Sequence, residues 1–158
     1  MIRLQQGDRR AYQALYARWG ARTMDFLLRR TGSRACAEDA LQDTWLRLFR
    51  HARSYQPGRP FAPWLFGIAV RAGHDAREPQ AEAFALTGSY EADPALRDRV
   101  LRALHGLDPE DRQLLLLNVE GFDATEVGRM LDLRPGTVRQ RLTRIRRHLQ
   151  GVLGEPDA

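Results

Sequence analysis

The most constraining feature of this sequence is a series of helix-start signals in residues 94–150. Asp93-Pro94 and Asp108-Pro109 each place a capping carboxylate before a proline at the first helical position. The segment 123–126 has the Asp and Glu spacing of a capping box, and Pro135 opens one more segment. These signals predict four helices, the last two separated by only a few residues.

The N-terminal half also follows a helical pattern. Apolar residues recur at helical spacing over residues 11–27, and Ser33 can cap a helix over about residues 34–53. A turn-rich segment, 56–60, separates this helix from one predicted over residues 61–77. No alternating strand pattern occurs anywhere in the sequence. The sequence therefore predicts an all-α fold.

Charge and composition predict two domains. Residues 78–93 contain four acidic residues and no basic one, together with Pro79 and Gly88, and show no sustained periodicity. A structureless loop of this length is uncommon inside a compact domain, although a long surface loop is the alternative. We therefore expect two small helical domains, 1–77 and 94–150, joined by an acidic, flexible linker.

Composition excludes several classes of protein. No segment approaches the roughly 18 apolar residues of a membrane helix, and the N-terminus lacks the apolar core of a signal peptide. We therefore expect a cytoplasmic protein without membrane insertion. Cys36 is the only cysteine, which excludes an intrachain disulfide and a cysteine-rich zinc site. No carboxylate pair, glycine-rich phosphate loop or nucleophile elbow accompanies the scattered histidines, so we expect no enzyme, no catalytic residue, no metal site and no cofactor.

The distribution of arginine indicates a nucleic-acid partner. The net charge is +5 and every basic residue is arginine, a bias that codon usage in a GC-rich genome explains better than function does. The clustering is more informative, because residues 134–149 hold six arginines and no acid. On a solvated surface helix these like charges would repel one another. The phosphates of DNA would compensate these positive charges.

The predicted helix that starts at Pro135 has two different sides. Its apolar face consists of Val138, Leu142, Ile145 and Leu149. The residues off this face are Arg139, Gln140, Thr143, Arg144 and Arg147. Arginine pairs with guanine and glutamine with adenine in the major groove. A short helix, a tight break and a longer helix form the helix-turn-helix arrangement, so this last helix is predicted to recognise DNA.

The predicted helix 34–53 also divides into two faces when projected at about 100° per residue. The core face is expected to hold Leu41, Thr44, Trp45, Leu48, Phe49 and Ala52. The opposite face holds Asp39, Gln42, Asp43, Leu46, Arg47 and Arg50. A single surface leucine is ordinary. Among these polar groups, however, Leu46 suits the apolar centre of a protein–protein contact.

Residues 53–77 combine basic and aromatic side chains. The basic ones are Arg53, Arg59, Arg71, His74 and Arg77, and the aromatic ones are Tyr55, Phe61, Trp64 and Phe66. This combination suits single-stranded DNA, in which cations follow phosphates and bases stack on rings. The alternative is that the aromatic residues are core, and for Trp64 we expect this alternative.

Several motifs resemble extracytoplasmic-function (ECF) sigma factors over nearly the whole chain. Gly7-Asp8-Arg9-Arg10-Ala11-Tyr12, residues 37–49 (AEDALQDTWLRLF) and residues 60–69 (PFAPWLFGIA) are similar to their region 2. Leu107-Asp108-Pro109-Glu110 and residues 136–146 (GTVRQRLTRIR) are similar to their region 4. The resemblance implies a two-domain helical protein that binds core RNA polymerase and directs transcription from specific promoters.

The resemblance also implies roles by position. The −35 element would be bound by Thr137, Arg139, Gln140, Arg141, Thr143, Arg144 and Arg147, with Arg146 as a further phosphate contact. The −10 element, including a flipped base, would be bound by Tyr55, Arg59, Phe61, Arg71 and His74. Core polymerase would be bound by Asp39, Gln42, Asp43, Leu46 and Arg47. An anti-sigma factor is expected as a further partner.

Two features depart from the family pattern or from an ideal helix. Arg71 stands where family members often have asparagine, and Gly67 and Gly73 each weaken their predicted helix by about 1 kcal/mol relative to alanine. The competing hypothesis is a stand-alone helix-turn-helix regulator that dimerises through residues 1–77. A single fused core that buried the arginine side of the last helix would contradict the two-domain interpretation.

Overall fold

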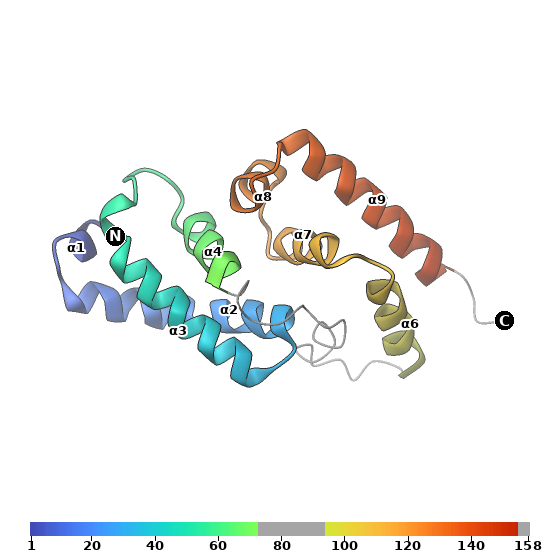
Figure 1. Ribbon diagram of the computed structural model, residues 1–158, viewed down its shortest axis with the longest axis horizontal. Helices are drawn as coiled ribbons and strands as arrows, with labels where there is room; N and C mark the ends of the chain where they lie inside the picture. Colours follow the sequence, from blue (N-terminus) through green and yellow to red (C-terminus); the bar gives the residue numbers. More distant parts are fainter. Residues whose placement is uncertain (73–93, 155–158) are drawn as a thin grey trace.

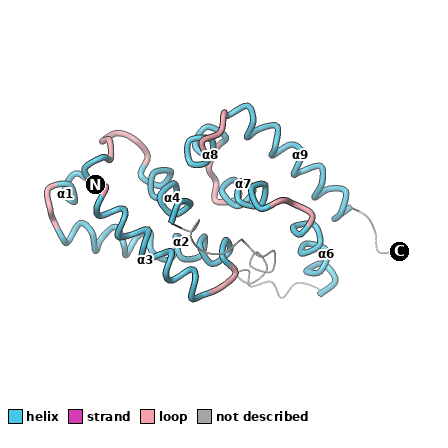
Figure 2. The backbone as a smooth tube through the Cα atoms, viewed as in Figure 1, coloured by secondary structure: helices cyan, strands magenta, loops and turns pink. Residues whose placement is uncertain are grey.

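The computed structural model describes residues 1–72 and 94–154, and within these ranges all regular structure is helical (Figure 2). The N-terminal elements are α1 (Ile2–Gln5), α2 (Arg9–Thr31), α3 (Arg34–Arg50), the 3₁₀ turn η1 (Ala52–Ser54) and α4 (Phe61–Ala72). The C-terminal elements are α6 (Pro94–His105), α7 (Pro109–Val119), α8 (Ala124–Leu131) and α9 (Pro135–Gly154). The predicted all-α fold is confirmed. The predicted linker, 78–93, and His74 lie outside the described residues.

Capping side chains explain where the helices begin. Asp8 accepts hydrogen bonds from the first turn of α2, Ser33 from α3, and Asp108 from α7. Asp123 and Glu126 form the reciprocal capping box of α8. The backbone N–H groups of Glu126 and Thr125 donate hydrogen bonds to the Asp123 carboxylate and lower the pKa of that carboxyl.

The N-terminal domain is built on α2, α3 and α4, which lie on the left of Figure 1. Trp45 is the largest fully buried side chain, and the rings of Tyr12 and Tyr16 meet it edge-on at centroid distances of 5.7 and 5.0 Å. Phe26 and Phe66 join α2 to α4 at 5.0 Å. Aromatic contacts therefore connect these helices within a core that is otherwise mostly aliphatic.

In the C-terminal domain α9 packs against α6, α7 and α8. Val138, Leu142 and Ile145 are buried, as the apolar face predicted, and Leu149 is half-buried. The four predicted helices are all present. The beginning of α6 is more exposed than the rest, since 45% of Leu96 is accessible.

The two domains contact each other. The Phe66 ring of α4 lies 5.0 Å from the Phe122 ring, and Gly67 of α4 faces Met130 of α8, where an added Cβ would lie in ordinary van der Waals contact, 3.7 Å from the methionine Cγ. The buried residues of both domains consequently form one continuous core. The two predicted helical domains are present. The structure adds a contact between them that the sequence did not predict, with α4 and α8 side by side in Figure 1.

One residue predicted for the core is exposed. Phe49 has 56% of its surface accessible and meets Tyr12 edge-on at 6.1 Å. The reason is its position at the margin of the buried face of α3, where the contact with Tyr12 of α2 leaves more than half of the side chain exposed. In addition, the helix predicted to continue to residue 53 ends at Arg50, and the 3₁₀ turn follows.

Candidate nucleic-acid interface

The turn between α8 and α9 is tight, and its geometry depends on two residues. Asp132 adopts the left-handed conformation (φ 57°), and the Leu133 backbone N–H donates to the Gly128 carbonyl at 2.8 Å. A Cβ at Gly128 would lie 2.5 Å from the Leu133 carbonyl oxygen, so only glycine fits without a backbone shift. The arrangement of α8, turn and α9 is a helix-turn-helix.

The side of α9 opposite the buried face is polar and exposed. The exposed residues are Thr137, Arg139, Gln140, Thr143, Arg144, Arg146 and Arg147. Within residues 1–72 and 94–154, Arg139, Arg146 and Arg147 form no ion pair with a carboxylate. The two-sided helix expected from the sequence is therefore present, and its arginine side is not buried by the domain contact.

Arg141 and Arg144 differ from the other arginines of α9 because carboxylates hold them. Arg141 pairs with Asp111 at 2.6 Å, Glu110 at 2.9 Å and Asp108 at 3.5 Å. Burial alone would lower the pKa of the Arg141 guanidinium, but the hydrogen bonds to Asp111 and Glu110 outweigh it and raise the pKa. Only 17% of the Arg141 side chain is exposed, against 64% of Arg144. Arg141 therefore fastens α9 to α7.

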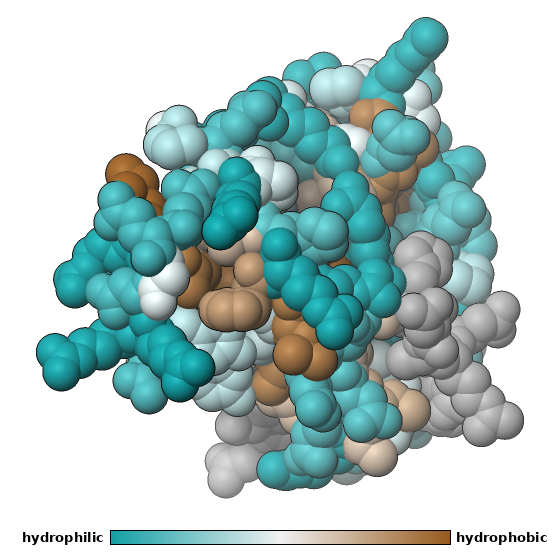
Figure 3. Space-filling model, turned by 60° about the vertical axis from the view of Figure 1, so that its left-hand side comes forward, coloured by the Kyte–Doolittle hydropathy of each residue, from teal (hydrophilic) through white to brown (hydrophobic). Residues whose placement is uncertain are grey.

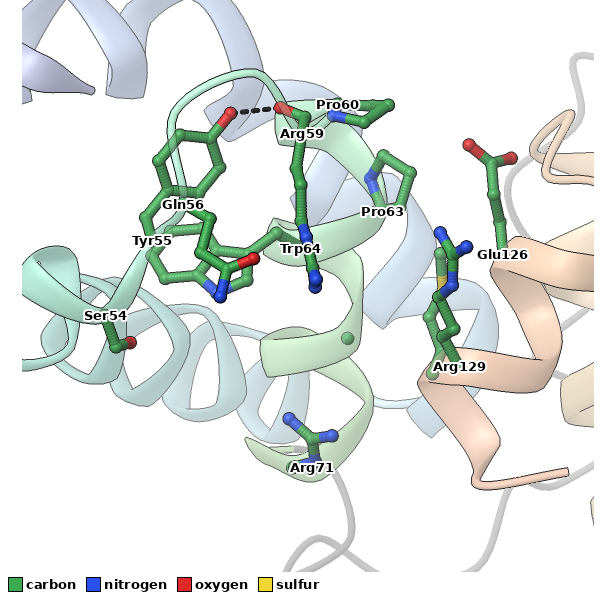
Figure 4. A pocket seen from close by; sticks show the side chains of 12 residues that line it. Ser54, Tyr55, Gln56, Arg59, Pro60, Pro63, Trp64, Arg71, Glu126 and Arg129 are labelled. Carbon is green, nitrogen blue, oxygen red and sulfur yellow. Dashed lines mark hydrogen bonds between the residues drawn. The ribbon is translucent and has the colours of Figure 1, made fainter.

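A pocket of about 290 Å³ lies between the loop that precedes α4 and helix α8. Figure 4 shows Tyr55, Arg59 and Trp64 on one side and Glu126 and Arg129 on the other. The lining also includes Ser54, Gln56, Pro60, Pro63, Gly67, Arg71 and Met130. Three arginines and two aromatic residues around one pocket give it the basic and aromatic character predicted for this segment.

The structure brings together three of the residues predicted for the −10 element. Tyr55, Arg59 and Arg71 all line the pocket. Phe61 does not line it, and packs instead against Trp19 with ring centroids 5.7 Å apart. Trp64, which we expected to be core, is half-buried and forms part of the pocket wall.

Two polar contacts that the sequence did not predict position the pocket. The Gln5 side-chain amide donates to the carbonyls of Ala52 and Tyr55 at 2.9 and 2.8 Å, and so fixes the start of the loop. The buried Arg30 of α2 donates to the last carbonyls of α4, including that of Val70 at 2.6 Å. Burial lowers the pKa of Arg30 to about 10. No local signal marks either contact, because each joins residues far apart in the sequence.

A third surface lies on the outer face of α3. Asp39, Gln42 and Leu46 are exposed, and Asp43 pairs with Arg47 at 2.7 Å, one turn further along. Leu46 has 47% of its surface accessible, so the structure confirms it as an exposed apolar residue, and Phe49 extends the apolar part of this face. Figure 3 shows how such apolar groups emerge in small patches between polar side chains on the N-terminal side of the molecule.

Comparisons with known proteins agree with this arrangement. The sigma-70 region 2 model matches residues 15–81, and the sigma-70 region 4 model matches residues 97–149. The RNA polymerase sigma factor CarQ of Myxococcus xanthus is 35% identical over 167 residues, covering 98% of this chain and 96% of its own. The ECF RNA polymerase sigma factor SigM of Mycobacterium tuberculosis is 33% identical and is covered over 80% of its length. The chain belongs to the ECF RNA polymerase sigma factors.

Two solved structures have the same fold. The structure of CnrH in complex with the cytosolic domain of CnrY matches with a TM-score of 0.73 and 25% identity, covering 97% of this chain and 94% of that one. The sigma factor RpoE in complex with the anti-sigma factor NepR from Bartonella quintana matches with a TM-score of 0.70 and 22% identity, covering 95% of this chain and 100% of that one. This ECF factor is a transcription initiation factor and not an enzyme. Among its described helices none is long and apolar enough to cross a membrane.

Proposed function

We propose that this ECF factor recognises its promoter through three surfaces on two domains, 1–77 and 94–150, with 78–93 as their linker. The outer side of α9 contacts the −35 element, the pocket beside α4 contacts the −10 element, and the outer face of α3 contacts core polymerase. The observation that carries the proposal is the two-sided packing of α9, with Val138, Leu142 and Ile145 buried and the arginine side exposed.

For the −35 element, base recognition falls to Arg139, Gln140, Thr143 and Arg144. Thr137, Arg146 and Arg147 contact phosphates. Arg141, which the resemblance also places at this element, contributes by holding α9 in place, since three carboxylates already surround its guanidinium. Such a division between bases and phosphates is usual at protein–DNA interfaces.

For the −10 element, the pocket receives an unstacked base. Arg59 and Arg71 supply positive charge for the phosphates, and Tyr55 and Trp64 supply aromatic surfaces. Flipping a base costs a few kcal/mol, and the basic and aromatic wall that belongs to the N-terminal domain, with Tyr55, Arg59 and Arg71, offsets part of that cost. Phe61 supports the pocket wall through Trp64, at a centroid distance of 6.1 Å. His74, two residues after the end of α4 in the sequence, contacts the same strand in this proposal.

For core polymerase, Leu46 is the apolar centre and Asp39, Gln42, Asp43 and Arg47 are its polar surroundings. An anti-sigma factor is the further partner that we propose, and the complex of RpoE with the anti-sigma factor NepR supports this part of the proposal. We place the protein in the cytoplasm, where core polymerase and promoter DNA are found.

In the arrangement of Figure 1 the protein cannot bind the two DNA elements at the same time. The −10 and −35 elements lie about 25 base pairs apart, or about 85 Å along B-form DNA. Residues of α8 line the pocket, so the two DNA-binding surfaces are close together. The 20-residue helix α9 is only about 30 Å long, which is much less than the distance between the two elements. The two domains therefore have to separate when the factor engages a promoter with polymerase.

The test is run-off transcription with purified core polymerase on candidate promoters, with and without this protein. We expect promoter-specific transcripts only when it is present. Asp43→Arg should reduce binding to core polymerase several-fold and leave the DNA contacts of α9 intact. A stable dimer that binds palindromic duplex and does not co-purify with core polymerase would favour the stand-alone regulator instead.

A further inference from the structure

A buried acid beneath α9 links two of its arginines. Asp111 lies in the first turn of α7, and only 5% of its side chain is exposed. Its Oδ1 accepts a hydrogen bond from Arg141 Nε at 2.6 Å, and its Oδ2 accepts one from Arg144 Nη2 at 2.6 Å. Because Asp111 is buried, it does not reach DNA itself.

The charge of Asp111 is compensated without Arg144. The carboxylate lies at the N-terminus of α7, where the helix dipole favours negative charge, and the Asp111 backbone N–H is capped by Asp108 at 2.8 Å. Arg141, with 17% of its side chain exposed, supplies a close positive charge. The additional bond to Arg144 is therefore more important for the orientation of Arg144 than for the burial of Asp111.

Arg144 is the partner that can still reach a ligand. Its side chain is 64% exposed and lies on the polar side of α9. Arginine has five N–H donors, and the contact with Asp111 uses only Nη2. A long exposed side chain normally loses rotamer freedom when it binds. A side chain that is already fixed before binding loses less rotamer freedom, and residues that fix it in this way improve a recognition site.

We propose that Asp111 is a positioning residue for −35 recognition. It holds the Arg144 guanidinium in the orientation that pairs with a base, and it thereby sets the sequence selectivity of α9 without touching DNA. This inference rests on the proposed function of α9 and adds a selectivity determinant on a different helix, outside the DNA interface.

The experiment uses holoenzyme reconstituted from the full chain and core polymerase. It transcribes a promoter library randomised across the −35 element, and sequencing of the transcripts gives the base preference at each position. Asp111→Asn should reduce the preference at the position governed by Arg144 by about 2- to 12-fold, the factor that corresponds to ordering one long side chain. Preferences elsewhere in the element should stay unchanged.

Glu110→Gln is the matched control. Glu110 is the neighbouring acid and also binds Arg141, but its side chain is 81% exposed and it forms no bond to Arg144. Its replacement should leave the whole preference profile unchanged. A purely structural role for Asp111 would instead lower transcription from all library members alike, and that outcome would overturn the proposal.

A double-mutant cycle separates this inference from the proposed function. Arg144→Ala alone should reduce one base preference by about 5- to 150-fold, and Asp111→Asn should add nothing in that background. Additive effects would refute the positioning role. If Arg144→Ala leaves every preference intact, the assignment of α9 fails. If Arg144→Ala changes a preference and Asp111→Asn does not, only this inference fails.

Asp111→Glu covers the case in which the asparagine variant does not fold. Glutamate keeps the charge beside Arg141 but displaces the carboxylate by one methylene. Circular dichroism should show an intact helical domain, and the base preference at the Arg144 position should again weaken. A folded Asp111→Glu variant with the wild-type profile would contradict the proposal.

Discussion

At the scale of single residues, one glycine sets the geometry of the helix-turn-helix. Gly128 admits the Leu133 carbonyl beneath α8, at a distance that any Cβ would violate. Gly67 differs, because a Cβ there would lie 3.7 Å from the Met130 Cγ, which is an ordinary van der Waals contact. Neither glycine has a positive φ. Close approach, and not backbone conformation, therefore accounts for Gly128.

We predict that Gly128→Ala destabilises the protein by about 1–3 kcal/mol, the usual cost of overpacking. Gly136→Ala is the matched control, because a Cβ there meets nothing within 4 Å and alanine favours the helix by up to about 1 kcal/mol. Urea denaturation of both variants provides the measurement. Equal stability of the Gly128 variant and the wild type would show that the turn relaxes freely.

At the scale of helices, the capping acids explain much of the fold. Asp123 caps α8, the first helix of the helix-turn-helix, and its backbone hydrogen bonds lower the pKa of its carboxyl. A carboxyl group whose pKa is lower in the folded state than in the unfolded state stabilises the fold when ionised. This contribution is present above the ordinary pKa of 3.8 and is lost as the pH falls through the lowered value.

The prediction compares two replacements of Asp123. Asp123→Ala should lower the thermal midpoint at pH 7, because the N-terminal N–H groups of α8 lose their acceptor. Asp123→Asn keeps a capping oxygen without the titrating charge, so its deficit at pH 7 should be smaller and should shrink as the pH falls below the ordinary carboxyl pKa. Melting curves recorded from pH 3 to pH 7 test both. A deficit of the asparagine variant that grows in acid would have the wrong sign.

Local signals of this kind made most helices predictable from the sequence. Ser33, Asp108 and Pro135 mark their helix starts through neighbours within a few residues, and the structure follows them. Phe49 was misassigned because periodicity identifies a face but not how far its neighbours extend over it. The carboxylates that hold Arg141 lie about 30 residues earlier, and no local pattern in the sequence announces that contact.

At the scale of the whole molecule, the domain contact includes an ion-pair cluster that the sequence also did not reveal. The side chain of Glu120, at the end of α7, is only 6% exposed and pairs with Arg22 at 3.1 Å and Arg29 at 2.9 Å. Arg22 also donates to the Glu120 carbonyl at 2.6 Å. Both arginines belong to α2, so this cluster fastens the C-terminal domain to the N-terminal one.

Glu120→Arg should open the molecule, because it removes the acid that both arginines bind and places three guanidiniums together. Cys36, the single cysteine, and a second cysteine at the exposed Gln150 can carry a fluorescent donor and acceptor. We expect lower energy transfer between donor and acceptor in the Glu120 variant. When the sigma factor is limiting relative to core polymerase, we also expect more transcription from this variant. Asp98→Arg, the same charge change on exposed α6, is the control. Unchanged transfer in the Glu120 variant would mean that the ion pairs do not hold the domains together.

The shared core also has a consequence for synthesis of the chain. A ribosome releases the N-terminus first, at about 5–20 residues per second. The side of α4 that carries Phe66 and Gly67 is covered only after α8 emerges, about 3–12 s later at that rate. Until then a nascent N-terminal domain displays an uncovered aromatic surface to chaperones and to other nascent chains, and arrival of the second domain brings that vulnerable interval to an end.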